Sequence, residues 1–199
     1  MPVTPSGKYV SETLLVRLRK KLGIDTLTPI HRIDRETAGL VLFSVKPEGR
    51  NLYQRLFREN FVSKHYEAIA PYRDDIAFPM RYRSRIEGGD SFMRMRVIPD
   101  GTPNAETEIS IQQKSNAFAH YHLKPVTGRK HQLRIQMCSL GIPLLNDRIY
   151  PVHLPEAVTD EMQAEEFRYP LQLVAKSVSF KDPVSEKIHH FESRHCLDL

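Results

Sequence analysis

The segment 31–39 holds a carboxylate between two cations. Asp34 stands between Arg32 and Arg35, directly before a run of apolar and β-branched residues at 39–45. Nearby cations lower the pKa of a carboxylate and keep it ionised, which an aspartate needs if it is to act as a nucleophile at neutral pH. Asp34 is therefore a candidate nucleophile displayed where a loop enters a strand. Taken alone, the same pattern also fits a surface cluster of ion pairs.

A second polar segment, 128–134, places a glycine and several cations at the start of a predicted helix. Cations at a helix start suit an anionic ligand, and a merely basic, exposed helix start is the alternative. A third segment, 64–66, contains Tyr66, which could stack on a base or could be ordinary strand packing. A fourth segment, 171–175, predicts only a buried strand.

The elements that must position these groups are predicted mainly as strands. Apolar residues at helical spacing predict a helix over 10–22 that ends at Gly23. A buried strand is expected at 39–45, and a short helix at 52–60. Alternation with a period of two predicts strands at 80–86, 92–98, 105–112 and 119–125. A helix at 131–140, an acidic helix at 155–167 and a late strand at 172–180 complete the prediction.

Strands and helices do not alternate regularly along the chain, so the predicted fold class is α+β with a mostly antiparallel sheet and flanking helices. The length of 199 residues fits one domain over 1–199, in which the acidic helix near 155–167 reads as an insertion. The net charge of +5 is compatible with a polyanionic partner without requiring one.

Composition also sets the expected location. The two cysteines, Cys138 and Cys196, cannot form a disulfide framework and fit a reducing compartment. No apolar run approaches the ~18 residues that span a bilayer, and the first residues lack the pattern of a signal peptide. A cytoplasmic protein without a membrane partner is expected.

Read in order, the four segments resemble the RluA-type pseudouridine synthases of the RluA/RsuA group. The resemblance is carried by HRIDRETAG at 31–39, KHYEA at 64–68, GRKHQLR at 128–134, SLGIPLLNDRIY at 139–150 and LQLVA at 171–175. The chain departs from the family pattern at Ala38, Asn146 and Val174, where serine, glycine and histidine are usual. A lysine–proline strand that usually comes first is missing ahead of 2–7, as is a small N-terminal RNA-binding module, so a trimmed chain or an alternative start is expected.

The resemblance implies a pseudouridine synthase catalytic fold and a reaction without metal or cofactor. A uridine is flipped out of its RNA, its glycosidic bond is cleaved with the help of Asp34, and the uracil is rejoined through carbon 5. Arg134 matches the arginine that pairs with the aspartate, and Tyr66 the tyrosine that packs on the target base. Arg32 matches an arginine that can occupy the space left by the flipped base.

The remaining substrate-binding candidates lie in the same two polar segments: His31, Arg35, Arg129, Lys130, His131 and Gln132. Both histidines are expected to brace their loops through hydrogen bonds, and the cations at 129–130 to meet phosphates. The partner implied is ribosomal RNA or transfer RNA, with ribosomal RNA preferred because more of the group acts there, and the enzyme is expected to be a monomer.

Two alternatives remain open. One is a metal-dependent hydrolase, because His120 and His122 alternate on a strand and His189 precedes His190, although no third ligand stands at a convincing spacing. The other is an RNA-binding protein with the same fold but no catalysis. The arginines at 81, 83 and 85 share one strand face and could follow an RNA backbone or simply face solvent.

Overall fold

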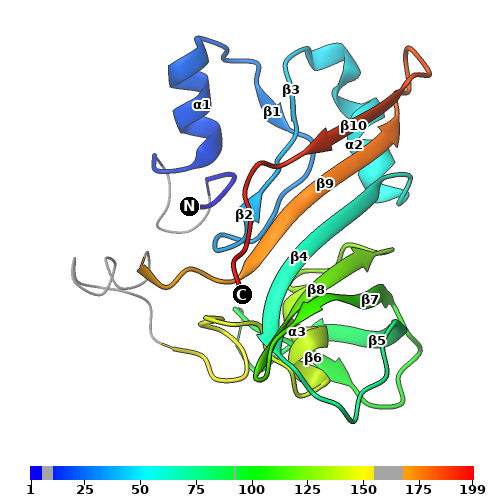
Figure 1. Ribbon diagram of the computed structural model, residues 1–199. Coiled ribbons are helices and arrows are strands. Elements are labelled where there is room, and N and C mark those ends of the chain that lie inside the picture. The colour runs from blue at the N-terminus through cyan, green and yellow to red at the C-terminus, as the bar shows by residue number, and fades with distance from the viewer. Residues whose placement is uncertain (6–10, 92, 155–167) are drawn as a thin grey trace. The chain divides into compact units, whose positions relative to one another are not determined.

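The computed structural model describes residues 1–5, 11–91, 93–154 and 168–199 (Figure 1). The chain divides into two compact units, the first made of Met1–Lys64 with Ala175–His195 and the second of His65–Val174 with Cys196–Leu199. The acidic helix predicted at 155–167 falls outside the described residues. Among the helices that are described, none has the length and apolar character needed to cross a membrane.

The first unit opens with helix α1 (Leu14–Leu22). The Thr13 hydroxyl accepts a hydrogen bond from the Val16 N–H at 3.3 Å, which satisfies one of the free donors of the first turn. Gly23 ends the helix in the left-handed region, at φ 67°. The helix predicted over 10–22 is thus confirmed with its end at Gly23, and it begins later than expected because Thr13 caps it.

Short strands and one further helix complete this unit. Strand β1 (Thr28–Pro29) pairs with β3 (Phe43–Ser44), while β2 (Ala38–Gly39) and β10 (Ile188–Glu192) both pair with β9 (Leu173–Lys181). After a 3₁₀ turn at Pro47–Gly49 comes helix α2 (Arg50–Arg58). The core of the unit consists of Val62, Val178 and Phe180, covered by Leu40, Leu42, Tyr53, Leu56 and Phe57.

The strand predicted at 39–45 is wrong in extent, because the structure breaks it into β2 and β3. Gly39 adopts a φ of +104°, which takes the backbone out of the extended conformation that a continuous strand requires. The helix predicted at 52–60 is confirmed by α2, and the late strand by β9. Strands β1 and β10 were not predicted.

The second unit is built on an antiparallel sheet in the order β4-β8-β7-β5-β6. Its strands are β4 (Ser63–Pro71), β5 (Met80–Gly88), β6 (Met95–Ile98), β7 (Ala105–Lys114) and β8 (Phe118–Pro125). The strands predicted from alternation are confirmed, and so is the α+β fold class with a mostly antiparallel sheet. Strand β6 starts at Met95 instead of 92, a position that the structure does not describe.

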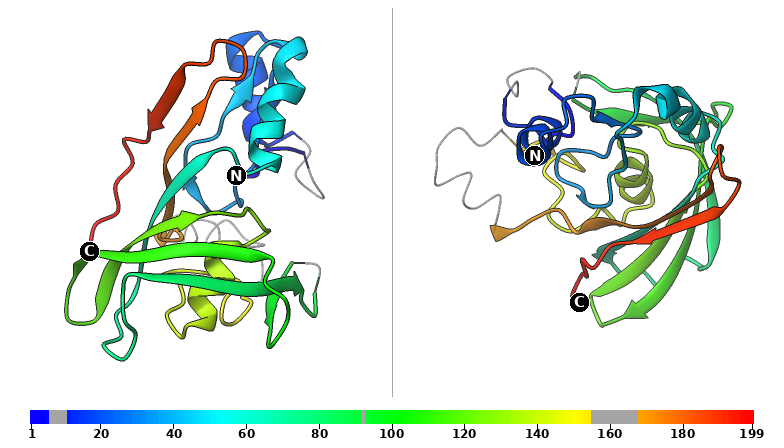
Figure 2. Two further views of the ribbon diagram at one scale, coloured as in Figure 1. Left: turned by 90° about the vertical axis from the view of Figure 1, so that its right-hand side faces the viewer. Right: turned by 90° about the horizontal axis from the view of Figure 1, so that it is seen from above.

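Helix α3 (Gln132–Ser139) lies on one face of this sheet, against β5 and β6 (Figure 2). The core beneath it joins small and large apolar side chains of three strands to two residues of the helix. Its members include Ala68, Ala70, Ile109, Ala119, Tyr121, Leu123, Leu133 and Met137.

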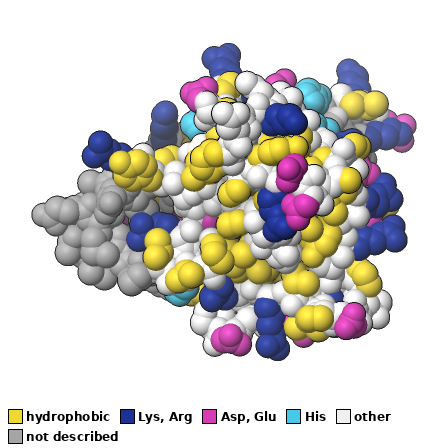
Figure 3. Space-filling model, turned by 60° about the horizontal axis from the view of Figure 1, so that its bottom comes forward, with side chains coloured by type: hydrophobic (Ala, Val, Ile, Leu, Met, Phe, Trp, Pro, Cys, Tyr) yellow, Lys and Arg dark blue, Asp and Glu magenta, His cyan; other side chains and the backbone are white. Residues whose placement is uncertain are grey.

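The other sheet face carries the arginines that were candidates for an RNA track. Arg81 lies 2.6 Å from Glu108, and Arg83 lies 2.8 Å from Glu106, across the β5–β7 pairing. Arg85 pairs with Glu87 at 2.9 Å. Matched charges on neighbouring strands indicate a solvated sheet face. Figure 3 shows acidic and basic side chains interspersed among hydrophobic ones on the coloured part of the surface that it presents.

Candidate active site

Gln132 closes the loop that leads into α3. Its side-chain oxygen accepts hydrogen bonds from the Thr127 hydroxyl (2.7 Å) and the Arg129 N–H (3.0 Å). Its amide nitrogen donates to the carbonyl of Glu106 and the hydroxyl of Thr107, both at 3.0 Å. These four bonds use the whole capacity of the amide. The side chain predicted to bind substrate is thus committed to holding the loop, whose next residues, at 129–130, are exposed cations.

A buried row of polar groups continues from Gln132 along α3. The Thr107 hydroxyl donates to the side-chain oxygen Oε1 of Gln136 at 2.6 Å, and the side-chain nitrogen Nε2 of Gln136 donates to the Ser84 hydroxyl at 3.0 Å. We call Gln132, Thr107, Gln136 and Ser84 the polar ladder; all four are at least 90% buried. Because these bonds are directional, the ladder fixes the rotation of α3 on the sheet and so the direction in which its other side chains point.

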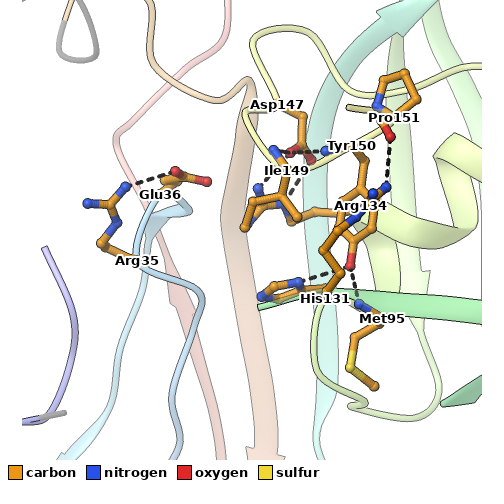
Figure 4. A network of polar contacts seen from close by, with 10 residues as sticks. Arg35, Glu36, Met95, His131, Arg134, Asp147, Ile149, Tyr150 and Pro151 are labelled. Carbon is orange, nitrogen blue, oxygen red and sulfur yellow. Dashed lines mark hydrogen bonds and ion pairs between the residues drawn. The ribbon is translucent and has the colours of Figure 1, made fainter. Parts of the chain in front are cut away.

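Arg134, on the same helix, forms a buried ion pair with Asp147. Nε of the guanidinium lies 2.8 Å from one carboxylate oxygen and Nη2 lies 2.6 Å from the other (Figure 4). The side chains are only 2% and 0% exposed. The Asp147 carboxylate also accepts the backbone N–H groups of Ile149 (2.8 Å) and Tyr150 (3.0 Å). Such a forked pair fixes the plane of the guanidinium as well as its position.

Asp147 is a residue to which the sequence reasoning gave no role. It stands in the motif at 139–150, so the only available signal was its place in that motif. The resemblance implied instead that Arg134 pairs with Asp34. The bonds to Asp147 involve Nε and Nη2, and the pairing with Asp34 stays a prediction.

Tyr150 and His131 support the other side of Arg134. The Tyr150 hydroxyl accepts the Met95 N–H at 2.8 Å and lies 3.1 Å from Nδ1 of His131 (Figure 4). The guanidinium carbon of Arg134 lies 5.8 Å from the centre of the tyrosine ring. Burial raises the pKa of Tyr150, so its hydroxyl stays protonated as a hydrogen-bonding group. The contact with Tyr150 holds the His131 ring in place, and its role in bracing the loop stays a prediction.

Tyr66 belongs to the same unit as Arg134. It lies on β4 opposite Leu123 of β8, and it packs against the core cluster that contains Leu133. The side chain is half-buried. The structure thus places the predicted base-stacking tyrosine on the sheet face that carries α3.

Asp34 lies in the first unit, where it begins a tight turn. Its carbonyl accepts the Thr37 N–H at 3.1 Å, and the residue is half-buried. Of the flanking cations, Arg35 lies 3.1 Å from Glu36 (Figure 4). Arg32 is exposed and donates to the Thr4 hydroxyl through a long bond of 3.4 Å.

Gly39 fixes the end of this loop against β9. A Cβ atom added at Gly39 would lie 2.3 Å from the carbonyl oxygen of Ala175, far inside van der Waals contact. That same oxygen accepts the Leu40 N–H at 3.1 Å. Only glycine allows both the positive φ and this backbone approach. The loop that carries Asp34 is therefore anchored to a regular strand a few residues after the carboxylate.

His31 is held in its loop on the other side of Asp34. Its Nε2 accepts the Leu42 N–H at 3.1 Å, and its ring stacks on Phe57 with centroids 4.3 Å apart. Burial, together with the nearby charge of Lys64, lowers the pKa of His31 to about 4. A neutral imidazole that accepts a backbone hydrogen bond agrees with the predicted bracing role.

Of the histidines considered as metal ligands, His120 and His122 lie on the sheet face opposite α3, where His120 is buried. His122 Nε2 lies 2.8 Å from Nδ1 of His65, and His120 lies 3.5 Å from Glu67. His189 lies 3.6 Å from Asp182 in the first unit. Within the described ranges, no three His, Cys, Asp or Glu side chains are grouped as metal ligands.

Comparison with known proteins matches the family model described as RNA pseudouridylate synthase to residues 1–139. A relative named dual-specificity RNA pseudouridine synthase RluA, from Pasteurella multocida, is 28% identical over 88% of this chain and 76% of its own length. Ribosomal large subunit pseudouridine synthase C of Vibrio cholerae is 32% identical over 79% of the chain, which spans only 48% of that relative.

Two solved human structures share the fold. Human RNA Pseudouridylate Synthase Domain Containing 1 superposes with a TM-score of 0.73 at 20% identity, covering 92% of this chain and 74% of that one. Human RNA Pseudouridylate Synthase Domain Containing 4 gives 0.70 at 22% identity, covering 98% and 81%. They confirm the predicted pseudouridine synthase fold. From the sequence relatives and the family match, the chain belongs to the RNA pseudouridylate synthase family and is an RNA pseudouridine synthase domain of the RluA type.

Proposed function

We propose that this chain isomerises uridine to pseudouridine within an RNA, with Asp34 as the nucleophile and Arg134 as its cationic partner. The observation that carries the proposal is the family match over 1–139, which includes both the loop of Asp34 and the helix start before Arg134. Asp34 assists cleavage of the bond between uracil and ribose, and the base is rejoined through carbon 5. The chemistry is acid–base and nucleophilic, and it is proposed to need no metal or cofactor.

The surroundings of Arg134 support its role. Asp147 contacts Nε and Nη2 of the guanidinium and thereby fixes the position of the cation. A guanidinium carries a third nitrogen, Nη1, and we propose that it serves Asp34. Lysine could not divide its contacts between two carboxylates in this fixed geometry.

Tyr66 and Arg32 complete the proposed site. The half-buried ring of Tyr66 packs on the core and is proposed to stack on the target base. Arg32, which is exposed, is proposed to fill the space left by the flipped nucleotide. The cations Arg129 and Lys130 are exposed beside α3 and are proposed to contact phosphates, whereas Gln132 and His131 act by positioning the loop.

The substrate is proposed to be ribosomal RNA. The Vibrio relative carries a large ribosomal subunit in its name, and the Pasteurella relative is named as dual-specificity. We propose that the chain acts as a monomer in the cytoplasm.

The test is a map of pseudouridine in RNA from cells that lack the gene and are complemented with variants. Wild-type protein should restore modification at one defined site in ribosomal RNA, and Asp34→Asn should not. Asp90→Asn, at a side chain that is 98% exposed, provides a matched loss of one carboxylate and should restore modification. Restoration by Asp34→Asn would refute the nucleophile, and a map that never changes would refute the enzyme. A restored site in transfer RNA would refute only the substrate.

A further inference from the structure

The first unit is the more basic of the two. Its described residues contain 15 lysines and arginines against 9 aspartates and glutamates, whereas the described part of the second unit has 13 against 10. In the second unit, arginines such as Arg81 and Arg83 face acidic partners. The excess of positive charge is therefore concentrated in the unit that carries Asp34.

Hydrogen bonds gather part of this charge at one end of the unit. Arg19, in the last turn of α1, donates to the Leu27 carbonyl at 2.9 and 3.1 Å. Arg50, at the start of α2, donates to the Thr26 carbonyl at 3.4 Å, and the Thr26 hydroxyl donates to the carbonyl of Val45 at 2.8 Å. The end of α1, the loop 24–27 and the start of α2 therefore meet. We call the cations brought together here the basic corner: Arg19, Lys20, Lys21, Lys46 and Arg50.

The lysines of the basic corner form no ion pairs with the described residues. Lys20, Lys21 and Lys46 are exposed, and none forms an ion pair with the described part of the chain. Asp25 and Glu48 are the acids beside them in the sequence. Elsewhere in the same unit, exposed arginines do have partners, as Arg55 has Glu59 and Arg17 has Glu12.

Two observations set the basic corner apart from an ordinary helix end. Cations in the last turn of a helix interact favourably with its C-terminal carbonyl groups, which accounts for the positions of Lys20 and Lys21. It does not account for Lys46 and Arg50, which belong to a different segment. In addition, Nε of Arg50 is buried without a hydrogen-bond acceptor in the described residues, so this guanidinium is incompletely satisfied.

We propose that the basic corner binds backbone phosphates of the substrate RNA, outside the nucleotide that is modified. Unpaired cations from two segments that converge on one loop are complementary to a chain of closely spaced phosphates. This inference rests on the proposed function for the identity of its ligand. It adds a binding surface that is separate from the loop of Asp34.

The basic corner and the loop of Asp34 lie at different places in the first unit. Figure 1 shows the loop between α1 and β1 at the end of the first unit opposite β2. Phosphates bound at the basic corner therefore belong to nucleotides several positions from the target in space. Removing cations of the basic corner should weaken RNA binding and leave the chemical step unchanged.

The experiment compares two double variants with equal loss of charge. Lys20→Gln/Lys21→Gln removes two cations of the basic corner. Lys181→Gln/Lys187→Gln removes two exposed lysines elsewhere in the same unit. The dissociation constant for the RNA that the enzyme modifies is measured between about 50 and 200 mM salt. Turnover at saturating RNA is measured in parallel.

The corner variant should lower the slope of log affinity against log salt by about 1.4, since each phosphate contact contributes roughly 0.7 on a single strand. Affinity at ~0.1 M salt should fall by roughly 10- to 30-fold, with kcat unchanged and the control pair close to wild type. An equal fall in the control pair would show that only net charge matters and would overturn the proposal. An unchanged slope or a loss of kcat in the corner variant would also overturn the proposal.

The two proposals fail separately. If the wild-type protein forms no pseudouridine while the corner variant alone loses affinity for ribosomal RNA, the binding surface stands and the catalytic proposal falls. If the enzyme is active and the corner variant binds RNA like wild type, only the basic corner is refuted.

Discussion

Asp147→Asn is expected to be among the most destabilising single-atom changes in the second unit. The substitution keeps the shape of the side chain but removes the charge that balances Arg134, which is 2% exposed. An amide offers one acceptor oxygen where the carboxylate receives four donors, from Nε and Nη2 of Arg134 and from two backbone N–H groups. A buried cation is left with an incomplete set of acceptors.

The size of the effect follows from this burial. Removing one partner of a buried ion pair costs about 3–5 kcal/mol, because the remaining charge stays desolvated. With a urea dependence of about 2 kcal/mol per molar, the unfolding midpoint should fall by roughly 2 M. The thermal midpoint should fall by roughly 6–20 °C, at about 2–4 °C per kcal/mol for a chain of this size.

The assay is urea unfolding followed by far-UV circular dichroism, with Glu108→Gln as the control. Glu108 also pairs with an arginine, Arg81, at 2.6 Å, but that pair is exposed and should hardly affect the midpoint. The double variant Arg134→Met/Asp147→Asn should regain part of the lost stability, because it removes the stranded charge. A midpoint for Asp147→Asn equal to that of Glu108→Gln would refute the reasoning.

Three further substitutions test the parts that surround the proposed site. Because the pKa of His31 is about 4 in the folded protein instead of 6.5, the unfolded chain binds more protons between these two pH values. The free energy of unfolding should therefore fall by on the order of 3 kcal/mol as the pH drops from 7 to 4. His31→Gln should flatten this pH dependence, which urea unfolding at several pH values measures. Gly39→Ala should lower the free energy of unfolding by roughly 3 kcal/mol or more, because of the positive φ and the clash with backbone. Gly88→Ala, with nothing within 4 Å of the added Cβ, should hardly change it. Equal thermal midpoints for the two variants would contradict this. Gln136→Leu should cost roughly 2–5 kcal/mol by stranding two buried hydroxyls, and a urea midpoint like wild type would argue against the polar ladder.

Periodicity alone was enough to predict those strands of the second unit whose side chains alternate between a core face and a solvated face. Strands β5 and β7 follow it clearly, since their arginines and acids face solvent while Ser84 and Ile109 face α3. Strand β10 escaped prediction because nearly all of its side chains are exposed and no burial pattern marks it. The break at Gly39 was also invisible, because it depends on contact with Ala175, far away in the sequence.

The candidate site was predictable as a set of residues but less so as an arrangement. Asp34, Tyr66 and Arg134 were found through motifs whose order along the chain is informative. The partner of Arg134 could not be found in this way, because an ion pair between a helix and a loop leaves no periodic trace. Gln132 illustrates the same limit, since its type suits ligand binding and only the folded structure shows that its amide is fully used within the protein.

The division of the first unit into two stretches of sequence has a consequence for its synthesis on the ribosome. Residues up to Lys64 leave the ribosome long before Ala175 and the rest of β9, with the 110 residues from His65 to Val174 made in between. At about 5–20 residues per second this interval lasts roughly 5–20 s. During that time the partner strand of Gly39 does not yet exist, so the loop of Asp34 cannot acquire its final anchor. The nascent chain therefore completes the loop of Asp34 only near the end of translation.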